Sequence, residues 1–316
     1  MTAKRNAYIA AIVYAMIIGL SFLFVKQTLT VASPLDTLAH RFSIAWLAAT
    51  VWFLATKQSV RVTKSDLRTI APLAVLYPVL FFAFQVFGLL YSSSSEAGII
   101  LATVPIFTLV FAGLVLKETS TPRQKIAIGL SVLGVIYILY MNSAGTGTSG
   151  SILGSGLLVL SAVVASLYNV LARRLTQRYS LFTLTYVMSF FGFITFNVLA
   201  LSDHLIRGTV HQFFQPFLHA DFVVAALYLG VLSSLLTSYL SNFALSRLPA
   251  SQMSVFSNLA TLITVMAGIV FLQEAFHYYH AIGAGMIIAG IIGVNYLAKA
   301  KREREREREE KRPSNS

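Results

Sequence analysis

The stretch Glu96–Tyr140, EAGIILATVPIFTLVFAGLVLKETSTPRQKIAIGLSVLGVIYILY, occurs twice in this chain in recognisable form. Shifted by 156 positions without a gap, it meets Gln252–Tyr296, QMSVFSNLATLITVMAGIVFLQEAFHYYHAIGAGMIIAGIIGVNY. Identical pairs include Thr108 and Thr264, Leu116 and Leu272, Glu118 and Glu274, Gly129 and Gly285, Gly134 and Gly290, Ile136 and Ile292, and Tyr140 and Tyr296. Apolar runs separated by Leu-x-Glu, with glycines at equal distances beyond, indicate an internal duplication.

The composition places this chain in a membrane. Of 316 residues, 56% are hydrophobic and only 11% are charged, and the mean hydropathy is +0.73. Its apolar runs of about 20 residues match the length of a helix that crosses a hydrocarbon core of about 30 Å. The first run lacks a small-residue cleavage site, so we expect it to be retained as a helix. Without cysteine, the chain has no disulfide, thiolate or cysteine-ligated metal site.

Ten apolar runs follow one another, five in each copy of the repeat. They are Ala7–Leu29, Leu35–Ala55, Thr69–Leu90, Ala97–Leu116 and Arg123–Met141, then Ile152–Leu171, Leu181–Leu201, Phe222–Leu245, Ala250–Leu272 and Tyr278–Ala298. Because five is odd, the second repeat enters the membrane in the opposite direction. We therefore predict an all-α membrane protein with ten transmembrane helices arranged as two inverted five-helix repeats, which is the architecture of alternating-access transporters.

The domain boundaries follow from the same runs. The first repeat covers residues 1–141 and the second covers 152–298. Between them lies 142–151, an uncharged Gly/Ser/Thr stretch that is typical of a flexible linker. Residues 299–316 form a charged tail, KREREREREEKR flanked by a few other residues, which we expect to be solvated in the cytoplasm.

The basic residues predict the orientation in the membrane, because cytoplasmic segments are enriched in Lys and Arg. With both termini in the cytoplasm, 21 of the 24 Lys and Arg lie on the cytoplasmic side, and only Lys26, Arg41 and Arg207 do not. We therefore expect a multi-pass protein of the cell membrane with both termini cytoplasmic. Topology also explains the basic pI, so nucleic-acid binding is not expected.

From 7 to 298 the sequence resembles the drug/metabolite transporter superfamily, specifically the bacterial EamA-type ten-helix exporters. The resemblance rests on Gly19–Lys26, His40-Arg41-Phe42, and the order Pro105, Leu116-Lys-Glu118, Gly129, Gly134, with a second copy at Leu272-Gln-Glu274, Gly285 and Gly290. The chain departs at Thr261, where that family often has a proline. The resemblance implies export of amino acids or other metabolites through a central cavity lined by both repeats, without fixing the substrate.

Polar and aromatic residues inside the spans recur at helical spacing and predict a neutral, hydrogen-bonding pocket. Each also has a structural alternative, because such side chains commonly form hydrogen bonds between membrane helices. The predicted substrate-binding residues are Tyr14, Ser21, Tyr77, Phe81, Gln85, Tyr168, Asn169, Ser238, Asn242 and Asn258.

Four charged residues stand apart from this pocket. Arg41 lies six residues inside Leu35, and together with Glu96 it is the predicted gate or coupling pair. Asp36, His40 and Glu96 are the expected neighbours of Arg41, either in a structural network or at the wall of an outer vestibule. Glu118 and Glu274 are predicted structural corners, where a carboxylate suits the positive end of a helix.

Other activities find no support in the sequence. There is no HExxH, Gly-x-Ser-x-Gly or phosphate-binding loop, so we predict no enzyme activity, no metal and no cofactor. The spans carry no carboxylate at mid-depth, which favours facilitative or weakly coupled transport of a neutral or zwitterionic small molecule. A non-transporting scaffold or lipid-handling protein is the alternative. The small residues Ala281, Gly285, Ala289 and Gly293 form a stripe that would let span five or another neighbouring helix of the chain approach, or would support a homo-oligomer.

Overall fold

The computed structural model describes residues 2–56, 63–116, 122–146, 149–248, 250–290, 292, 293 and 296. The first repeat contains α1 (Thr2–Thr28), α2 (Pro34–Thr56), α3 (Lys64–Ala74), η1 (Val75–Leu80), α4 (Phe81–Tyr91), α5 (Ser94–Leu101), α6 (Val104–Leu116) and α7 (Pro122–Thr146). The second contains α8 (Ser149–Leu175), α9 (Leu181–Arg207), η2 (Val210–Gln212), η3 (Gln215–Leu218), α10 (Ala220–Leu227), η4 (Tyr228–Leu236), α11 (Thr237–Leu245) and α12 (Ala250–Leu272), followed by helical residues 278–290.

The protein is an all-α membrane protein, and the described ranges contain no strand. Seven helical runs are long and apolar enough to cross a bilayer, namely Arg5–Thr28, Pro34–Ala55, Lys64–Tyr91, Ser94–Val115, Ile152–Leu175, Leu181–Arg207 and Ala220–Leu245. The other three predicted spans coincide with α7, with α12, whose shorter apolar part is Leu259–Leu272, and with helical residues 278–290.

Local sequence signals explain several helix ends. The Thr63 side chain accepts the backbone N–H of Asp66, and the Asp66 carboxylate accepts that of Thr63, so a capping box begins α3. Ser180 caps α9 because its side chain accepts the backbone N–H of Thr183. At the other end of α9, Gly208 adopts a left-handed conformation with φ of 68°, which a residue without Cβ adopts readily.

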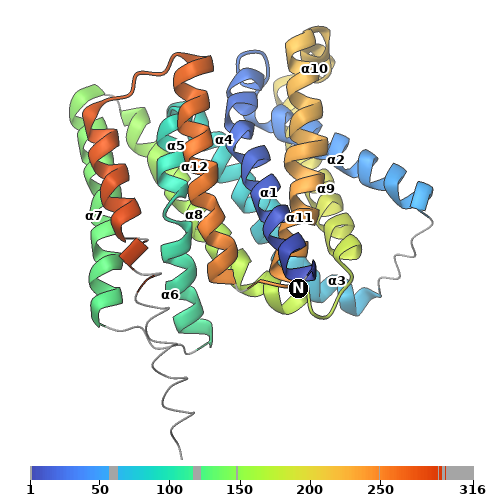
Figure 1. Cartoon of the computed structure of the whole chain (residues 1–316). Coiled ribbons are helices and arrows are strands. Elements are labelled where there is room, and N and C mark those ends of the chain that lie inside the picture. The colour runs from blue at the N-terminus through green and yellow to red at the C-terminus, as the bar shows by residue number, and fades with distance from the viewer. Residues whose placement is uncertain are drawn as a thin grey trace, which may run out of the picture.

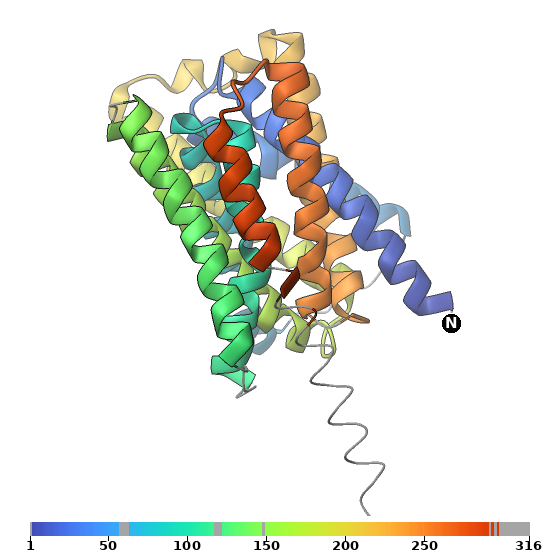
Figure 2. The ribbon, with the colours of Figure 1, turned by 60° about the vertical axis from the view of Figure 1, so that its left-hand side comes forward.

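Successive passes run in alternating directions through the bundle, as Figures 1 and 2 show. We call the end that holds Thr2 the N-terminal face and the end that holds Thr28 and Glu274 the opposite face. α1 runs from the N-terminal face to the opposite face, and α8, its counterpart, runs back (Figure 1). α1 packs against α12 and α10–η4–α11, while α8 packs against α5–α6 and η1–α4. These equivalent contacts express the inverted relationship of the two repeats.

A π-helical segment interrupts the third pass of each repeat. The two segments are η1 and η4, and the repeat offset of 156 places η1 onto residues 231–236, inside η4. In η1 the backbone of Tyr77 is not helical, with φ of −136° and ψ of 117°. Pro78 follows it, and a residue before proline is disfavoured in the α region. Both repeats therefore depart from regular helix at the same depth.

Small residues let specific helices approach closely. A Cβ on Gly134 would lie 2.8 Å from the carbonyl oxygen of Gly283, so α7 meets helical residues 278–290 backbone to backbone. Gly285, a member of the predicted small-residue stripe, has no atom within 4 Å of such a Cβ. Span five is the neighbour, as predicted, and both Gly283 and the stripe residue Gly293 contact it: a Cβ on Gly293 would lie 3.2 Å from Cβ of Ala127.

Most of the predicted linker is helical. α7 continues to Thr146 and α8 begins at Ser149, and residues 147 and 148 lie outside the described part of the chain. Neither proline nor charge occurs between 142 and 151, so nothing in the side chains stops the flanking helices from extending. The tail from 299 onward also lies outside the described residues.

Candidate functional site

A cavity lies between the two repeats, and the empty space within it and at its open mouth amounts to about 620 Å³. It receives side chains from α1, η1, α4, α5 and α6 of the first repeat and from α8, α11 and α12 of the second. They are Tyr14, Ile18, Phe22, Tyr77, Phe81, Gly98, Leu101, Val104, Ala165, Tyr168, Asn169, Ser241, Ala260, Thr261 and Thr264. The lining is therefore largely apolar and aromatic, with a few hydroxyls and one amide, as in typical small-molecule sites.

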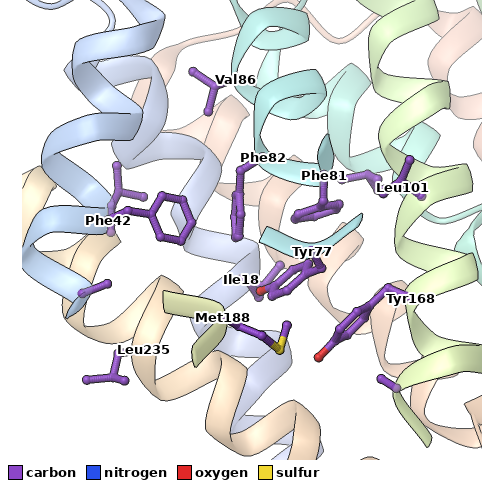
Figure 3. Close-up of a cluster of buried hydrophobic side chains, with 14 of the residues drawn as sticks. Ile18, Phe42, Tyr77, Phe81, Phe82, Val86, Leu101, Tyr168, Met188 and Leu235 are labelled. Carbon is purple, nitrogen blue, oxygen red and sulfur yellow. The ribbon is translucent and has the colours of Figure 1, made fainter. Parts of the chain in front are cut away.

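Two tyrosines from different repeats form one wall of this cavity. The rings of Tyr77 and Tyr168 are stacked with centroids 4.6 Å apart, and Phe81 and Phe82 lie beside Tyr77 (Figure 3). The Tyr168 hydroxyl donates to Oδ1 of Asn242 at 2.9 Å, so this amide fixes a ring of the wall from behind. Because the stack joins the repeats, relative motion of the repeats would change the shape of the cavity.

Two threonines on α12 connect the opposite wall to the first repeat. Thr261 donates to the carbonyl of Gly98 at 2.8 Å, and Thr264 donates to the carbonyl of Gly19 at 2.9 Å. Both carbonyls belong to glycines at which a Cβ would contact α12 closely. Both hydroxyls therefore contact the first repeat, and the Thr264 hydroxyl also lies 2.9 Å from the carbonyl oxygen of Ala260 in its own helix.

The structure brings five of the ten predicted substrate-binding residues to the cavity: Tyr14, Tyr77, Phe81, Tyr168 and Asn169. Ser21 instead donates to the carbonyl of Ile18 within its own helix. Gln85 and Ser238 are buried but are not part of the lining, and Asn242 supports Tyr168. The side chain of Asn258 lies outside the described residues.

Sequence reasoning missed the apolar and small members of the lining, such as Phe22, Leu101 and Val104. Nothing in the sequence distinguishes an aromatic or aliphatic residue that faces a cavity from one that packs in the core. Ser241 and Thr261 carried a usable signal, because both are hydroxyl residues within apolar spans.

Arg41 is fully buried and contacts the π-helical segment η4. Its Nε donates to Oγ of Ser234 at 2.7 Å, and its Nη2 donates to Oγ of Ser233 at 2.9 Å. The guanidinium carbon lies 4.0 Å from the ring centroid of Phe82, which is a cation–π distance. A charged side chain inside a membrane span is costly, so its position indicates a specific function or partner.

The expected neighbours of Arg41 have other partners. The Asp36 carboxylate contacts Nε2 of His204 at 2.9 Å, and Nε2 of His40 donates to the carbonyl of Phe213 at 2.7 Å. The Glu96 carboxylate accepts from the hydroxyl of Ser155 on α8. The predicted network of Arg41 with Asp36 and His40 is therefore wrong. Asp36 instead contacts α9, and His40 contacts the segment that follows α9. The sequence did not indicate that these segments lie beside α2.

Glu274 belongs to the second repeat, but its carboxylate lies at the N-terminus of α5 in the first repeat. Its carboxylate accepts the backbone N–H groups of Ser94 at 2.6 Å and Ser95 at 2.9 Å, and the Ser95 hydroxyl at 2.7 Å. These groups begin α5, and Lys26 at the end of α1 interacts electrostatically with Glu274 and Glu96. From the sequence we expected this carboxylate to lie at the N-terminus of the next helix in the chain. Glu118 lies outside the described residues.

Comparison with known proteins agrees with this architecture. The model of the family described as "EamA-like transporter family" matches residues 5–140 and 152–296. An uncharacterized transporter of Bacillus subtilis (strain 168), YcxC, is 53% identical over 294 residues, which cover 92% of this chain and 93% of that protein. An uncharacterized transporter of Archaeoglobus fulgidus is 27% identical over 281 residues, with 89% and 93% covered.

A solved structure titled "Crystal structure of protein" shares the fold. It superposes with a TM-score of 0.64 at 19% identity and covers 94% of this chain and 98% of its own. The two matched segments coincide with the two repeats that pack around the cavity. The chain therefore belongs to the EamA-like transporter family and is a membrane transporter.

Proposed function

We propose that this transporter exports amino acids or related small metabolites across the cell membrane by alternating access. The observation that supports the proposal is a cavity to which both oppositely directed repeats contribute residues, at about the middle of their helices. Two halves related in this way expose one site to either side through the same rearrangement. The direction of transport rests on the resemblance to bacterial exporters.

The two π-helical segments supply a means for this rearrangement. Tyr77 of η1 lines the cavity. η4 is followed at once by α11, which contributes Ser241 to the lining. π-helical turns inside α-helices are rare and occur often at functional sites. Bending at these equivalent points would move the third pass of each repeat and open the cavity to one face at a time.

The proposed topology places both termini in the cytoplasm and the opposite face outside the cell. We expect membrane-impermeant maleimide on whole cells to label Ser149→Cys and Thr209→Cys but not Thr63→Cys. The chain contains no cysteine, so each single variant reports one position without background. Labelling after permeabilisation shows that Thr63→Cys is present and reactive. The reverse pattern on intact cells would contradict the orientation.

Transport itself is tested in proteoliposomes. We expect efflux of some members of a panel of labelled amino acids and organic cations, with no accumulation when a pH gradient is imposed. The Glu96→Gln variant should transport at close to the wild-type rate, because glutamine retains an oxygen that accepts from Ser155. The measurement is initial efflux rate with and without the gradient, and protein-free liposomes are the control.

Two results would change this proposal. Efflux equal to that of protein-free liposomes for the whole panel would contradict amino-acid and metabolite export. Gradient-driven accumulation that Glu96→Gln abolishes would contradict facilitative transport and make Glu96 the proton carrier.

A further inference from the structure

The charge on Arg41 is not compensated within the described part of the chain. The side chain is fully buried, and neither of the two ion pairs found there involves it. Its hydrogen-bond partners are the neutral groups of Ser233 and Ser234, and its Nη1 has no partner among the described residues. A buried guanidinium thus retains a donor that points at no acceptor.

A series of hydroxyl groups connects this guanidinium to the cavity. Ser241 lines the cavity, and Ser238, Thr237, Ser234 and Ser233 precede it along the same pass, all buried. The Tyr77 hydroxyl, from the cavity wall, interacts with the side chains of Ser238 and Thr237. We call these five Ser and Thr residues the hydroxyl track. These hydroxyl groups lie along one pass between the cavity and Arg41.

An aromatic ring separates the two ends of this path in the present conformation. Phe82 lies against the Arg41 guanidinium on one side, and its centroid is 5.1 Å from that of Tyr77 on the other. Figure 3 shows Phe82 between Phe42 and the Tyr77–Tyr168 stack. Movement of Phe82 or of η4 would therefore join Arg41 to the cavity.

The chemistry of the site points to one class of ligand group. A guanidinium forms charge-assisted hydrogen bonds with carboxylates, and Nη1 of Arg41 is available to donate to a carboxylate oxygen. The track supplies neutral donors and no second cation, which suits a single negative charge. We propose that Arg41 binds the carboxylate of the transported molecule, which reaches it along the hydroxyl track. This inference rests on the proposed transport function and narrows its substrates to molecules that carry a carboxylate.

Binding of matched ligands tests the site directly. The probes are 3-phenylpropionate and 3-phenylpropanamide, which share the ring and chain but differ in charge. We expect the carboxylate, and not the amide, to raise the melting temperature of the purified protein at constant ionic strength. Arg41→Gln should weaken this carboxylate binding roughly tenfold or more, as expected for loss of a charge-assisted pair. Arg207→Gln, which removes an exposed positive charge, should bind as the wild type does.

Two further variants separate binding from folding. Arg41→Lys keeps the positive charge without the planar guanidinium and should retain partial binding of the carboxylate. Ser238→Ala removes one hydroxyl of the hydroxyl track and leaves Arg41 unchanged. It should weaken binding of 3-phenylpropionate several-fold and should not change the response to 3-phenylpropanamide. If neither Arg41 variant folds, Ser238→Ala decides the question. A purely structural role of Arg41 would lower the melting temperature of the free protein without changing the preference for the carboxylate.

Efflux of labelled L-phenylalanine from proteoliposomes distinguishes this inference from the proposed function. Equal carboxylate binding by wild type and Arg41→Gln, or no preference of the wild type for the carboxylate, would overturn the Arg41 site even if efflux is observed. Arg41-dependent carboxylate binding with no efflux of any panel member would support the site and contradict the export proposal.

Discussion

The Gly19→Leu variant is expected to yield little folded protein, because α1 and α12 cross directly at this residue. A Cβ there would lie 2.7 Å from Cβ of Ile263 and 2.8 Å from the carbonyl oxygen of Ala260. A leucine would force the helices apart and break the hydrogen bond from Thr264 to the carbonyl of Gly19. Overpacking of this kind, together with a lost hydrogen bond, costs about 3 kcal/mol or more.

The measurement is the fraction of monodisperse protein in size-exclusion chromatography, with the melting temperature of what remains. Gly156→Leu on α8 is the matched control, because a Cβ added there would have no atom within 4 Å and the residue is exposed. We expect the control to behave as the wild type does. Equal behaviour of the two variants would contradict the close crossing of α1 and α12.

The Glu274→Ala variant is expected to destabilise the opposite face by about 3 kcal/mol, because hydrogen bonds to a charged group are worth about 1.5–3 kcal/mol each. The substitution leaves the backbone N–H groups of Ser94 and Ser95 at the start of α5 without their acceptor. It also removes a contact between α5 and the segment after α12. We therefore expect both a lower melting temperature and a looser opposite face.

A cysteine at a buried position reports the second effect. In a Ser92→Cys background, Glu274→Ala should raise the rate of maleimide labelling several-fold, since Ser92 is buried beside α5. Glu274→Gln, which keeps one acceptor oxygen, should have an intermediate effect. Asp203→Ala is the control, because it breaks an exposed ion pair worth at most about 1 kcal/mol. Unchanged labelling and stability in Glu274→Ala would show that this cap does not hold the face together.

The sequence by itself determined the fold class and the duplication. Apolar runs of about 20 residues cross a bilayer as α-helices, because a helix satisfies its backbone polar groups within its own segment. Their odd number in each repeat then implies the inverted relationship. The same sequence also marked Arg41 as exceptional, since a charge within an apolar run is visible without coordinates.

Periodicity was a partial guide to the cavity. It identifies which residues share a helix face, but it does not identify the depth at which that face meets empty space. Tyr77 and Phe81 line the cavity, whereas Gln85, one turn further along the same predicted face, does not. The π-helical segments add to the uncertainty, because an extra residue in a turn rotates every residue that follows it.

Only the tertiary structure decided the partners of the charged residues. Glu274 binds groups about 180 positions away in sequence, and Arg41 binds serines more than 190 positions away. Which carboxylate meets which helix end depends on how the two repeats pack, and no local pattern encodes that distance. Hydrophobicity and the internal repeat can be recognised in the sequence itself. The partner of a buried charge depends instead on which helix the tertiary packing brings next to it.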